Sequence, residues 1–329
     1  MLGRTKLGSL SVSVMAFGAM YLGTKTDVET SLGLLNEYAD RGGNFIDTAN
    51  NYCFWVEGGK SDASERLIGE WLSAHVQRDQ FIVATKVGAR PIHEGAVRYE
   101  PEGLSRNVIR SAVEMSLKNL RTEYVDLLYA HLDDRTVPLE ETLSTFDELI
   151  KAGKVREIAC SNHATWRIEA ARGVSAKEGL ASYTAIQQRH SYFQPSLGHE
   201  LEFAKELGER GGRGVQEAVG SEMFDYAATH PGFRIVGYSP LLQGGVADPE
   251  RMPTNYRTPD NENRRAVLEA VAGEIGASSS QVVFAWMMAS PQEVIPLVAS
   301  SRAEQLRDNL DAANVSLSPD QITRLNQAV

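Results

Sequence analysis

Cysteine is almost missing from this sequence: Cys53 and Cys160 are the only two among 329 residues. Two cysteines are too few for a disulfide framework or a zinc ribbon, and their scarcity favours a reducing compartment, most simply the cytoplasm. Long apolar runs are missing too, since none approaches the roughly 18–20 residues that span a bilayer. The first residues alternate polar and apolar side chains, which predicts a pair of strands rather than a signal peptide. We therefore expect a cytoplasmic protein without a membrane partner.

Dense blocks of lysine and arginine are also lacking, and the net charge is −10 at pH 7. This balance argues against nucleic-acid binding, because phosphate backbones attract a basic surface. An anionic ligand would need a local basic pocket. Two phosphate-binding signatures are missing as well. Residues 18–23 read GAMYLG rather than G-x-G-x-x-G, and no G-x-x-x-x-G-K-S/T occurs.

Short apolar or β-branched runs alternate with longer segments whose apolar residues recur every three or four positions, which predicts an α/β protein. The predicted strands are 14–18, 44–48, 81–87, 125–131, 158–161, 185–188, 234–238 and 294–298. The main predicted helices are 64–75, with Ser64 as N-cap, 102–120, 139–152 and 261–275. Such alternation indicates parallel strands with crossover helices. The count alone leaves a doubly wound sheet open, but the missing glycine fingerprint favours a (β/α)8 TIM barrel, with residues 1–329 as a single domain and an N-terminal β-hairpin.

Two segments exceed ordinary loop length. Residues 196–232 contain helical patterns at 200–209 and 221–230, and residues 241–260 are rich in glycine, proline and asparagine. Long excursions in a compact domain are usually lids or binding loops. We expect them at the C-terminal face of the barrel.

Four ionisable side chains stand at or just after the ends of consecutive predicted strands. Asp47, Lys86 and His131 close strands, and Tyr52 follows Asp47 in the next loop. The carboxyl ends of the strands carry the chemistry of a (β/α)8 barrel, and neighbouring strands lie about 4.8 Å apart. We therefore expect the four side chains to converge within hydrogen-bond range.

Each of the four has an ordinary structural interpretation when it is taken alone. Asp47 can cap a turn, and Lys86 can form an ion pair at the end of the barrel. His131 can be a packing residue, and Tyr52 can lie on the rim. Their joint placement favours chemistry, because packing seldom requires an acid, a base and two donors on adjacent strand ends.

The set suits proton transfer to a carbonyl oxygen. A free tyrosine has a pKa of about 10, and a nearby cation such as Lys86 is expected to lower that of Tyr52. Asp47 would hold Lys86 in place, and His131 would donate a hydrogen bond to the carbonyl and stabilise the developing alkoxide. None of these side chains delivers a hydride, so the reaction requires a redox cofactor. Tyr52 is the predicted proton donor.

Across nearly the whole chain the sequence resembles the aldo-keto reductase superfamily. The matching pieces, in order, are NFIDTANNY at 44–52, ATK at 84–86, DLLYAH at 126–131, GKVREI at 153–158, CSN at 160–162, GYSPL at 237–241 and residues 301–309. The resemblance implies a catalytic tetrad of Asp47, Tyr52, Lys86 and His131. It also implies a small carbonyl substrate, and NAD(P)H bound in an extended pose across the barrel mouth without a Rossmann fold.

The resemblance further implies which residues contact the cofactor. Ser161 and Asn162 would hold the nicotinamide carboxamide with the help of Gln187. The whole implied set is Ala19, Met20, Asp47, Ser161, Asn162, Gln187, Tyr238, Ser239, Pro240, Leu241, Ser301, Arg302, Gln305, Asp308 and Asn309, with Tyr238 stacked on the nicotinamide ring. Arg302 beside Ser301 suits a phosphate, because guanidinium and hydroxyl both donate to oxyanions. This pair favours NADPH over NADH.

The sequence departs from the family pattern in a few places. Ala299 stands where many members have glycine, and His190 stands where tyrosine is common. The loop after Tyr52 is long and carries Phe54 and Trp55, which we interpret as a substrate-binding wall for a hydrophobic or ring-shaped carbonyl. The alternative is a loop packed on the protein's own surface or at a contact within a homo-oligomer.

We therefore predict an NADP-dependent aldo-keto reductase, an oxidoreductase acting on the CH–OH group of donors. The superfamily also contains nicotinamide-sensing regulatory subunits, as in potassium-channel β subunits, and this is the alternative function. A metal-dependent barrel hydrolase has less support, since His93, His131, His190 and Glu57 show no ligand spacing. We expect no metal site. The substrate and the oligomeric state stay open.

Overall fold

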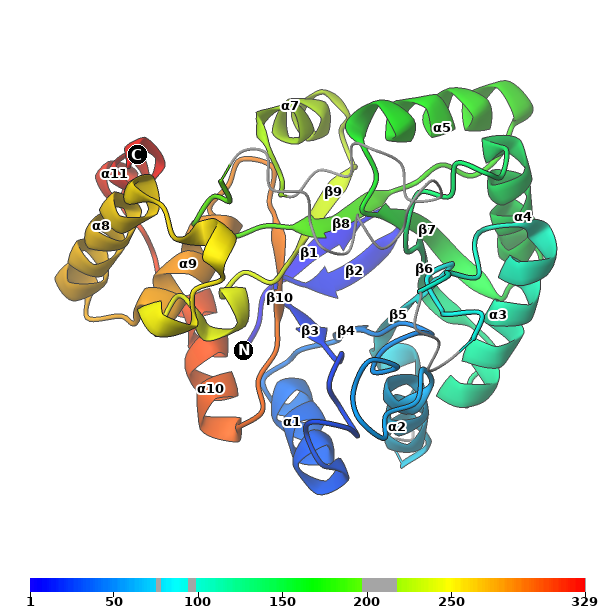
Figure 1. Ribbon diagram of the computed structural model, residues 1–329, viewed down its shortest axis with the longest axis horizontal. Helices are drawn as coiled ribbons and strands as arrows, with labels where there is room; N and C mark the ends of the chain where they lie inside the picture. Colours follow the sequence, from blue (N-terminus) through cyan, green and yellow to red (C-terminus); the bar gives the residue numbers. More distant parts are fainter. Residues whose placement is uncertain (75–77, 94–98, 197–217, 329) are drawn as a thin grey trace.

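A closed barrel of parallel strands forms the centre of the molecule (Figure 1). The structure is a computed structural model and describes residues 1–74, 78–93, 99–196 and 218–328. The strands follow one another in the order β10-β3-β4-β5-β6-β7-β8-β9. Their bounds are Ala16–Gly18 (β3), Phe45–Asp47 (β4), Ile82–Val87 (β5), Val125–Ala130 (β6), Val155–Ser161 (β7), Ala185–Arg189 (β8), Arg234–Tyr238 (β9) and Ile295–Val298 (β10). Each overlaps a predicted strand, so the (β/α)8 fold is confirmed.

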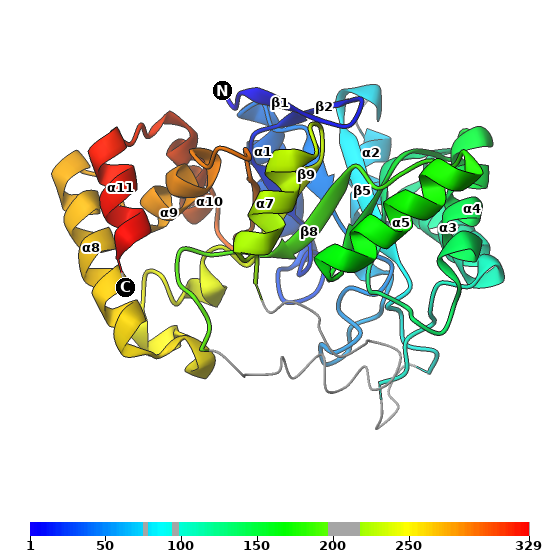
Figure 2. The same ribbon diagram turned by 90° about the horizontal axis from the view of Figure 1, so that it is seen from above.

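The N-terminal hairpin closes one end of the barrel. Its strands, Arg4–Leu7 (β1) and Leu10–Ser13 (β2), pair antiparallel across a turn in which Gly8 has a φ of 55°. Leu7, Leu10 and Val12 are buried in one apolar cluster with inward-facing residues of the barrel strands. In Figure 2 the hairpin lies at the top, and the loops after β3, β4 and β9 lie at the opposite end. The barrel interior next to the hairpin is therefore apolar.

Helices surround the barrel on its outside (Figures 1 and 2). They are Val28–Asp40 (α1), Ala63–Ala74 (α2), Arg106–Leu120 (α3), Leu139–Lys151 (α4), Thr165–Glu178 (α5), Ser221–Thr229 (α7), Pro259–Ile275 (α8), Ser279–Met288 (α9), Ala303–Asp311 (α10) and Pro319–Gln327 (α11). The face predicted for α2 is buried as expected, namely Leu67, Ile68, Trp71 and Leu72. Burial of one such side chain contributes about 1.5–3 kcal/mol, which fastens each helix to the barrel.

Three predicted helix starts are wrong: α8 begins at Pro259 rather than at residue 261, and the errors at α2 and α3 reveal contacts near the barrel mouth. Ser64 does not cap α2, which begins at Ala63; its hydroxyl donates to the Ala19 carbonyl at 2.8 Å instead. The helix predicted from residue 102 begins at Arg106, because the Glu102 carboxylate accepts a hydrogen bond from the Gly88 amide at 2.8 Å. Tertiary hydrogen bonds thus override the local helix signals.

The long loops are partly structured where they are described. Residues 241–260 hold three short 3-10 turns, at Leu242–Gly244, Pro249–Arg251 and Thr254–Tyr256; others lie at Arg78–Gln80 and Ala312–Asn314. The helical pattern predicted at 200–209 lies outside the described residues, whereas that at 221–230 corresponds to α7. Within the described ranges no helix is long and apolar enough to cross a membrane.

Candidate active site

Side chains along each barrel strand point alternately inward and outward, and this alternation explains where the polar side chains of the barrel interior lie. Phe45, Ala84, Ala159 and Ala185 all belong to the apolar cluster inside the barrel. The residues two positions further on point to the same side of their strands. These are Asp47, Lys86, Ser161 and Gln187, which therefore form the next layer toward the mouth.

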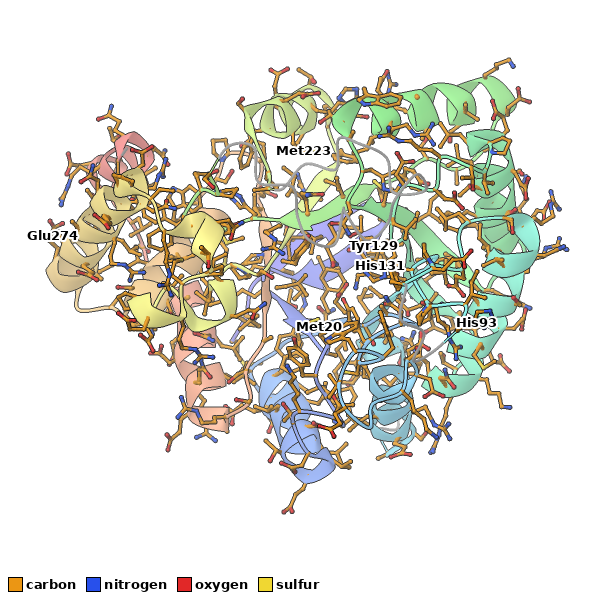
Figure 3. The ribbon with its side chains drawn as sticks, viewed as in Figure 1. Met20, His93, Tyr129, His131, Met223 and Glu274 are labelled. Atoms are coloured by element: carbon orange, nitrogen blue, oxygen red, sulfur yellow. The ribbon has the colours of Figure 1, made fainter. Side chains whose placement is uncertain are left out.

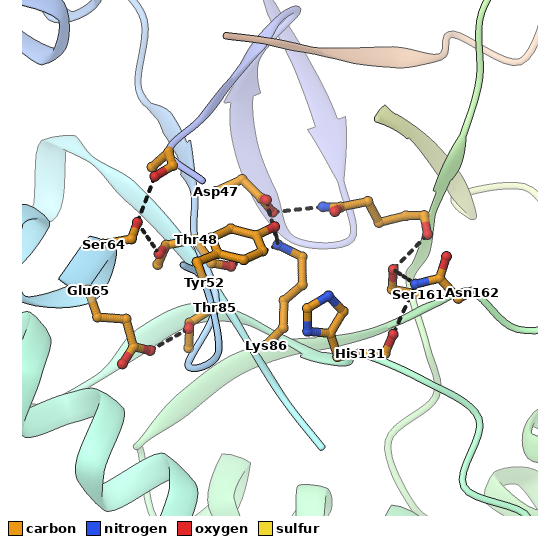
Figure 4. Close-up of polar contacts among 12 residues, drawn as sticks. Asp47, Thr48, Tyr52, Ser64, Glu65, Thr85, Lys86, His131, Ser161 and Asn162 are labelled. Atoms are coloured by element: carbon orange, nitrogen blue, oxygen red, sulfur yellow. Dashed lines mark hydrogen bonds and ion pairs between the residues drawn. The ribbon is translucent and has the colours of Figure 1, made fainter. Parts of the chain in front are cut away.

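Lys86 is the hub of this layer (Figure 4). Its Nζ donates to Asp47 Oδ1 at 2.5 Å, to the Thr48 carbonyl at 2.7 Å and to the Tyr52 hydroxyl at 2.8 Å. The Lys86 side chain is 0% exposed and that of Asp47 is 1% exposed. Gln187 Nε2 donates to the second oxygen of Asp47 at 2.7 Å. The ammonium has three donors and all are used, which fixes the positions of both Asp47 and Tyr52.

Burial acts on both members of this ion pair. It raises the pKa of Asp47 and lowers the pKa of Lys86, while the attraction between the two charges opposes both shifts. An isolated buried charge is strongly unfavourable, and a hydrogen-bonded opposite charge offsets that cost. Each of the two residues therefore keeps the other charged inside the barrel.

The expected effect of Lys86 on Tyr52 is not what the structure has. Burial raises the pKa of Tyr52 well above 10, and the negative charge of Asp47 adds to the increase. The prediction of a lowered pKa is wrong because it counted the Lys86 charge without the Asp47 charge and the burial. At neutral pH Tyr52 is therefore a protonated phenol, the form that can donate a proton.

His131 lies beside Tyr52 without bonding to it. The two rings meet edge to face, with centroids 6.1 Å apart. Burial, together with the nearby Lys86 charge, lowers the pKa of His131 well below 6.5, so its imidazole is neutral. Its Nδ1 is buried and has no hydrogen-bond partner among the described residues. A neutral imidazole can still donate one hydrogen bond.

The loop that carries Tyr52 is tied down on both sides. Asn50 Nδ2 donates to Glu102 at 2.7 Å, and Asn51 Nδ2 donates to the Ala89 carbonyl at 3.0 Å. On the other side Cys53, with a φ of 76°, places its thiol 2.8 Å from the Met20 carbonyl. Positive φ is unusual for a residue other than glycine, so tertiary contacts hold this turn. They set the position of the phenol.

The proposed substrate wall contains one packed ring and one exposed ring. Phe54 stacks on Tyr99, with centroids 5.4 Å apart and planes 8° apart, so it packs on the chain's own surface. Trp55 is 45% exposed and lies edge to face with Tyr52 at 6.5 Å. Trp55 is therefore the aromatic surface next to the phenol, and Phe54 packs against it edge to face, with ring centroids 5.0 Å apart.

A second group of predicted residues adjoins the tetrad on β7, β8 and β9. The Ser161 hydroxyl donates to the Gln187 carbonyl at 2.9 Å. Asn162, with a φ of 58°, donates to the His131 carbonyl at 3.1 Å and accepts from the Tyr238 hydroxyl at 3.0 Å. Tyr238 is half-buried, so part of its ring is open to the mouth. The arrangement leaves an aromatic face next to amide groups.

Hydrogen bonds to backbone groups also hold the loops after β3 and β9 at the barrel mouth. Ala19 is buried, and its amide donates to the Asp47 carbonyl at 2.9 Å; the Met20 carbonyl accepts from Cys53. Ser239 has a φ of 55° and Pro240 accepts a hydrogen bond from Ser191 at 2.7 Å. The half-buried Leu241 follows them.

The residues expected at the adenosine end lie on and before α10, and they differ in availability. Ser301 and Arg302 are exposed, and the Arg302 side chain has no ion pair among the described residues. Asn309 is buried and its Nδ2 has no partner in the described part of the chain. Gln305 accepts from Ser300 at 3.1 Å. The Asp308 carboxylate is already engaged, because it accepts from Ser278 and Gln281 at the start of α9.

Residues missed from the sequence act mainly through backbone or packing. Thr48 contacts Lys86 through its backbone carbonyl, and Glu102 acts on the Tyr52 loop from a distant segment, so neither has a local signal. Tyr129 is buried with its ring centroid 5.5 Å from Lys86 Nζ. The period of two places Tyr129 on the same side of β6 as His131, so that signal was available.

Metal-binding side chains do not gather in the described ranges. They contain no group of three or more histidines, cysteines, aspartates and glutamates that could hold a metal ion. Figure 3 shows His131 and Tyr129 at the centre of the barrel and His93 well away from them.

Comparison with known proteins places this arrangement among oxidoreductases. The aldo/keto reductase family model matches residues 14–329. The uncharacterized oxidoreductase YrpG of Bacillus subtilis is 29% identical over 99% of this chain and 94% of its own length. Aryl-alcohol dehydrogenase (NADP+) of Phanerodontia chrysosporium is 28% identical over 97% of this chain and 83% of its own. Norsolorinic acid reductase of Emericella nidulans is 26% identical over 98% and 79%, respectively.

Proposed function

Because the chain belongs to the aldo/keto reductase family, we propose that it reduces an aldehyde or ketone to the alcohol with NADPH as hydride donor. The observation that carries the proposal is the Tyr52 hydroxyl, held by the buried Lys86–Asp47 pair at the barrel mouth. A protonated phenol fixed at that position is suited to a general acid. The nicotinamide supplies the hydride, which no protein side chain can.

The roles of the protein groups follow from their contacts. Tyr52 donates its proton to the carbonyl oxygen as negative charge develops there. Lys86 donates a hydrogen bond to the phenol oxygen and so stabilises the phenolate that is left. Asp47 keeps Lys86 charged. The neutral His131 orients the carbonyl oxygen by donating a hydrogen bond from its imidazole.

The described residues fit a dinucleotide across the mouth. Asn309 Nδ2 is a buried donor in need of an acceptor, and the half-buried Tyr238 ring offers a stacking surface. Ser161, Asn162 and Gln187 would hold the carboxamide. Arg302, exposed and free of any ion pair within the described ranges, would bind the 2′-phosphate that distinguishes NADPH. Asp308 fits less well, because α9 already occupies its carboxylate.

A hydrophobic or ring-bearing carbonyl suits the wall best. Trp55 presents an exposed aromatic surface beside the phenol, and apolar pockets favour such substrates. Two of the related proteins are named for their substrates, aryl alcohols in one case and norsolorinic acid in the other. We also retain from the sequence the cytoplasmic location and the absence of nucleic-acid and membrane partners.

The alternative is a nicotinamide-sensing regulatory subunit with little catalysis. The complete hydrogen-bonded set of Asp47, Tyr52 and Lys86 favours the enzyme, because a sensor needs no proton donor. Loss of NADPH absorbance with a panel of aromatic and aliphatic carbonyls separates the two. Tight NADPH binding without turnover of any carbonyl would favour the sensor.

The assignment of the proton donor is tested with Tyr52→Phe. Carbonyl reduction is expected to fall by at least about 10²-fold, because the substitution removes the acid, while the NADPH dissociation constant stays nearly unchanged. Tyr21→Phe is a matched control: this half-buried rim tyrosine also lies under a lysine, 4.5 Å from Lys25 Nζ. Turnover that persists in Tyr52→Phe would remove Tyr52 from the acid role.

A further inference from the structure

Arg189 stands at the carboxyl end of β8, two residues beyond Gln187. By the period of two it shares the inward side of the strand with Gln187, one layer closer to the mouth. It pairs in register with Tyr238 on the adjacent strand β9, and β8 and β9 lie side by side in Figure 1. The Arg189 carbonyl accepts from the Val219 amide at 2.8 Å, and the next amide, of His190, donates to the Tyr238 carbonyl at 3.1 Å. The backbone that carries this side chain is therefore fixed.

The charge of Arg189 has no carboxylate to balance it within the described ranges. Arg189 is half-buried, and its Nε is buried without a hydrogen-bond partner in those ranges. Two other partly buried arginines do have a carboxylate partner: Arg78 pairs with Asp126, and Arg167 pairs with Asp133. Buried charges in proteins are ordinarily paired, since desolvation is costly. Arg189 is, moreover, the only arginine in the described ranges with a buried side-chain nitrogen that lacks a hydrogen-bond partner, in a protein of net charge −10.

The groups packed against Arg189 are neutral. Its Cζ lies 5.7 Å from the centroid of the Tyr238 ring, and Tyr256 also interacts with the guanidinium. His190, the next residue, is uncharged at neutral pH because burial lowers its pKa to about 4. These neighbours orient the guanidinium by stacking and polar contact, and none of them contributes a negative charge at that pH.

From this geometry we propose that Arg189 is an oxyanion-binding residue of the barrel mouth. Its position favours the diphosphate of the dinucleotide as the bound group. Arg189 lies beside Tyr238, where the loop through Ser239 begins, whereas Tyr52 follows β4, which lies opposite β8 in the barrel order. A carboxylate on the substrate is the other source of the same chemistry. Only the identity of the dinucleotide rests on the proposed function.

The experiment compares wild-type protein with Arg189→Gln and with Arg264→Gln as the matched control. Arg264 is also half-buried and lies over a tyrosine ring, 5.5 Å from the centroid of Tyr192, but it belongs to α8 outside the barrel. Dissociation constants for NADPH, NADH and inorganic diphosphate are measured by titration. We expect R189Q to weaken all three about tenfold or more, as loss of a charge-assisted hydrogen bond does, and R264Q to change none of them.

A second pair of ligands separates the two sources. If NADPH, NADH and diphosphate bind R189Q as they bind wild type, but the KM for 4-carboxybenzaldehyde rises about tenfold while that for benzaldehyde does not, the oxyanion is a substrate carboxylate. Equal values for every ligand in a folded R189Q overturn the proposal. If R189Q does not fold, the same titrations are made with Arg189→Lys, which keeps the charge and removes the planar fork of donors. An unchanged melting temperature shows that this variant is folded. A wild-type protein that reduces no carbonyl refutes the proposed function instead, and the diphosphate titration still decides the role of Arg189.

Discussion

The two ends of the proposed site are built in opposite ways. At the catalytic end, Asp47 and Lys86 are fully buried and hydrogen-bonded to each other and to Tyr52 and Gln187. At the adenosine end, Ser301 and Arg302 are exposed, and the Arg302 side chain has no ion pair in the described part of the chain. One end is assembled from contacts within the protein, and the other presents its charge to the surroundings.

The difference follows from the cost of burying charge. A lysine inside the barrel must be paired, because desolvation of an isolated ammonium is strongly unfavourable. An arginine in water needs no partner, and it can meet a phosphate without first breaking a strong contact. Substitutions at the catalytic end should therefore alter both stability and turnover, whereas those of exposed residues without an ion pair at the adenosine end, such as Arg302, should alter affinity alone.

The largest effect is expected for Lys86→Met. Loss of the ammonium leaves Asp47 buried without its counter-charge, so the free energy of unfolding should fall by about 3–5 kcal/mol. Turnover should fall by about 10²–10⁴-fold, because the phenolate of Tyr52 loses its stabilising cation. Urea denaturation and carbonyl reduction at pH 7 measure the two effects.

A double variant isolates the charge pair from the chemistry. Asp47→Asn combined with Lys86→Met removes both charges, so much of the lost stability should return while turnover stays low. A single Lys86→Met variant as stable as wild type would show that the pair is not needed to hold the barrel mouth together.

At the other end, Arg302→Ala should leave stability unchanged and weaken NADPH far more than NADH. The difference should be about 2 kcal/mol if the guanidinium bonds the 2′-phosphate. Arg307→Ala is the matched control, since Arg307 is exposed on α10, the helix that Arg302 precedes, but is paired with Glu37 at 2.9 Å. Equal losses for both dinucleotides would contradict the phosphate assignment.

The barrel could be predicted from the sequence because its signals are repeated. The strands from β3 to β10 follow one rule, a short apolar run before a helical pattern, and an error in one would not have changed the fold. The helix starts predicted at Ser64 and at residue 102 failed because they rested on local sequence patterns alone, and a distant partner decided each. Ala19 holds the Ser64 hydroxyl, and Gly88 holds the Glu102 carboxylate.

The site could be predicted in position but not in electrostatics. Asp47, Tyr52 and Lys86 were found because strand ends meet at one edge of a barrel. The direction of the Tyr52 pKa could not be found that way, since it depends on burial and on how far the Asp47 charge lies from the phenol. Arg189 was missed because an arginine at a strand end is ordinary until its surroundings show that no carboxylate in the described ranges faces it.

Asp308→Ala has the smallest expected effect. It separates residues of the adenosine end that bind the cofactor from those that stabilise the fold. Asp308 accepts hydrogen bonds from Ser278, the N-cap of α9, at 3.1 Å and from Gln281 at 3.0 Å. Its loss should therefore lower the free energy of unfolding by about 1 kcal/mol, with NADPH and NADH affinities unchanged. Denaturation and dinucleotide titrations of the same preparation provide both values. Weaker binding at unchanged stability would instead place Asp308 among the residues that contact the adenosine. Asp308 would then belong with the exposed binding residues of this end rather than with the residues bonded inside the protein.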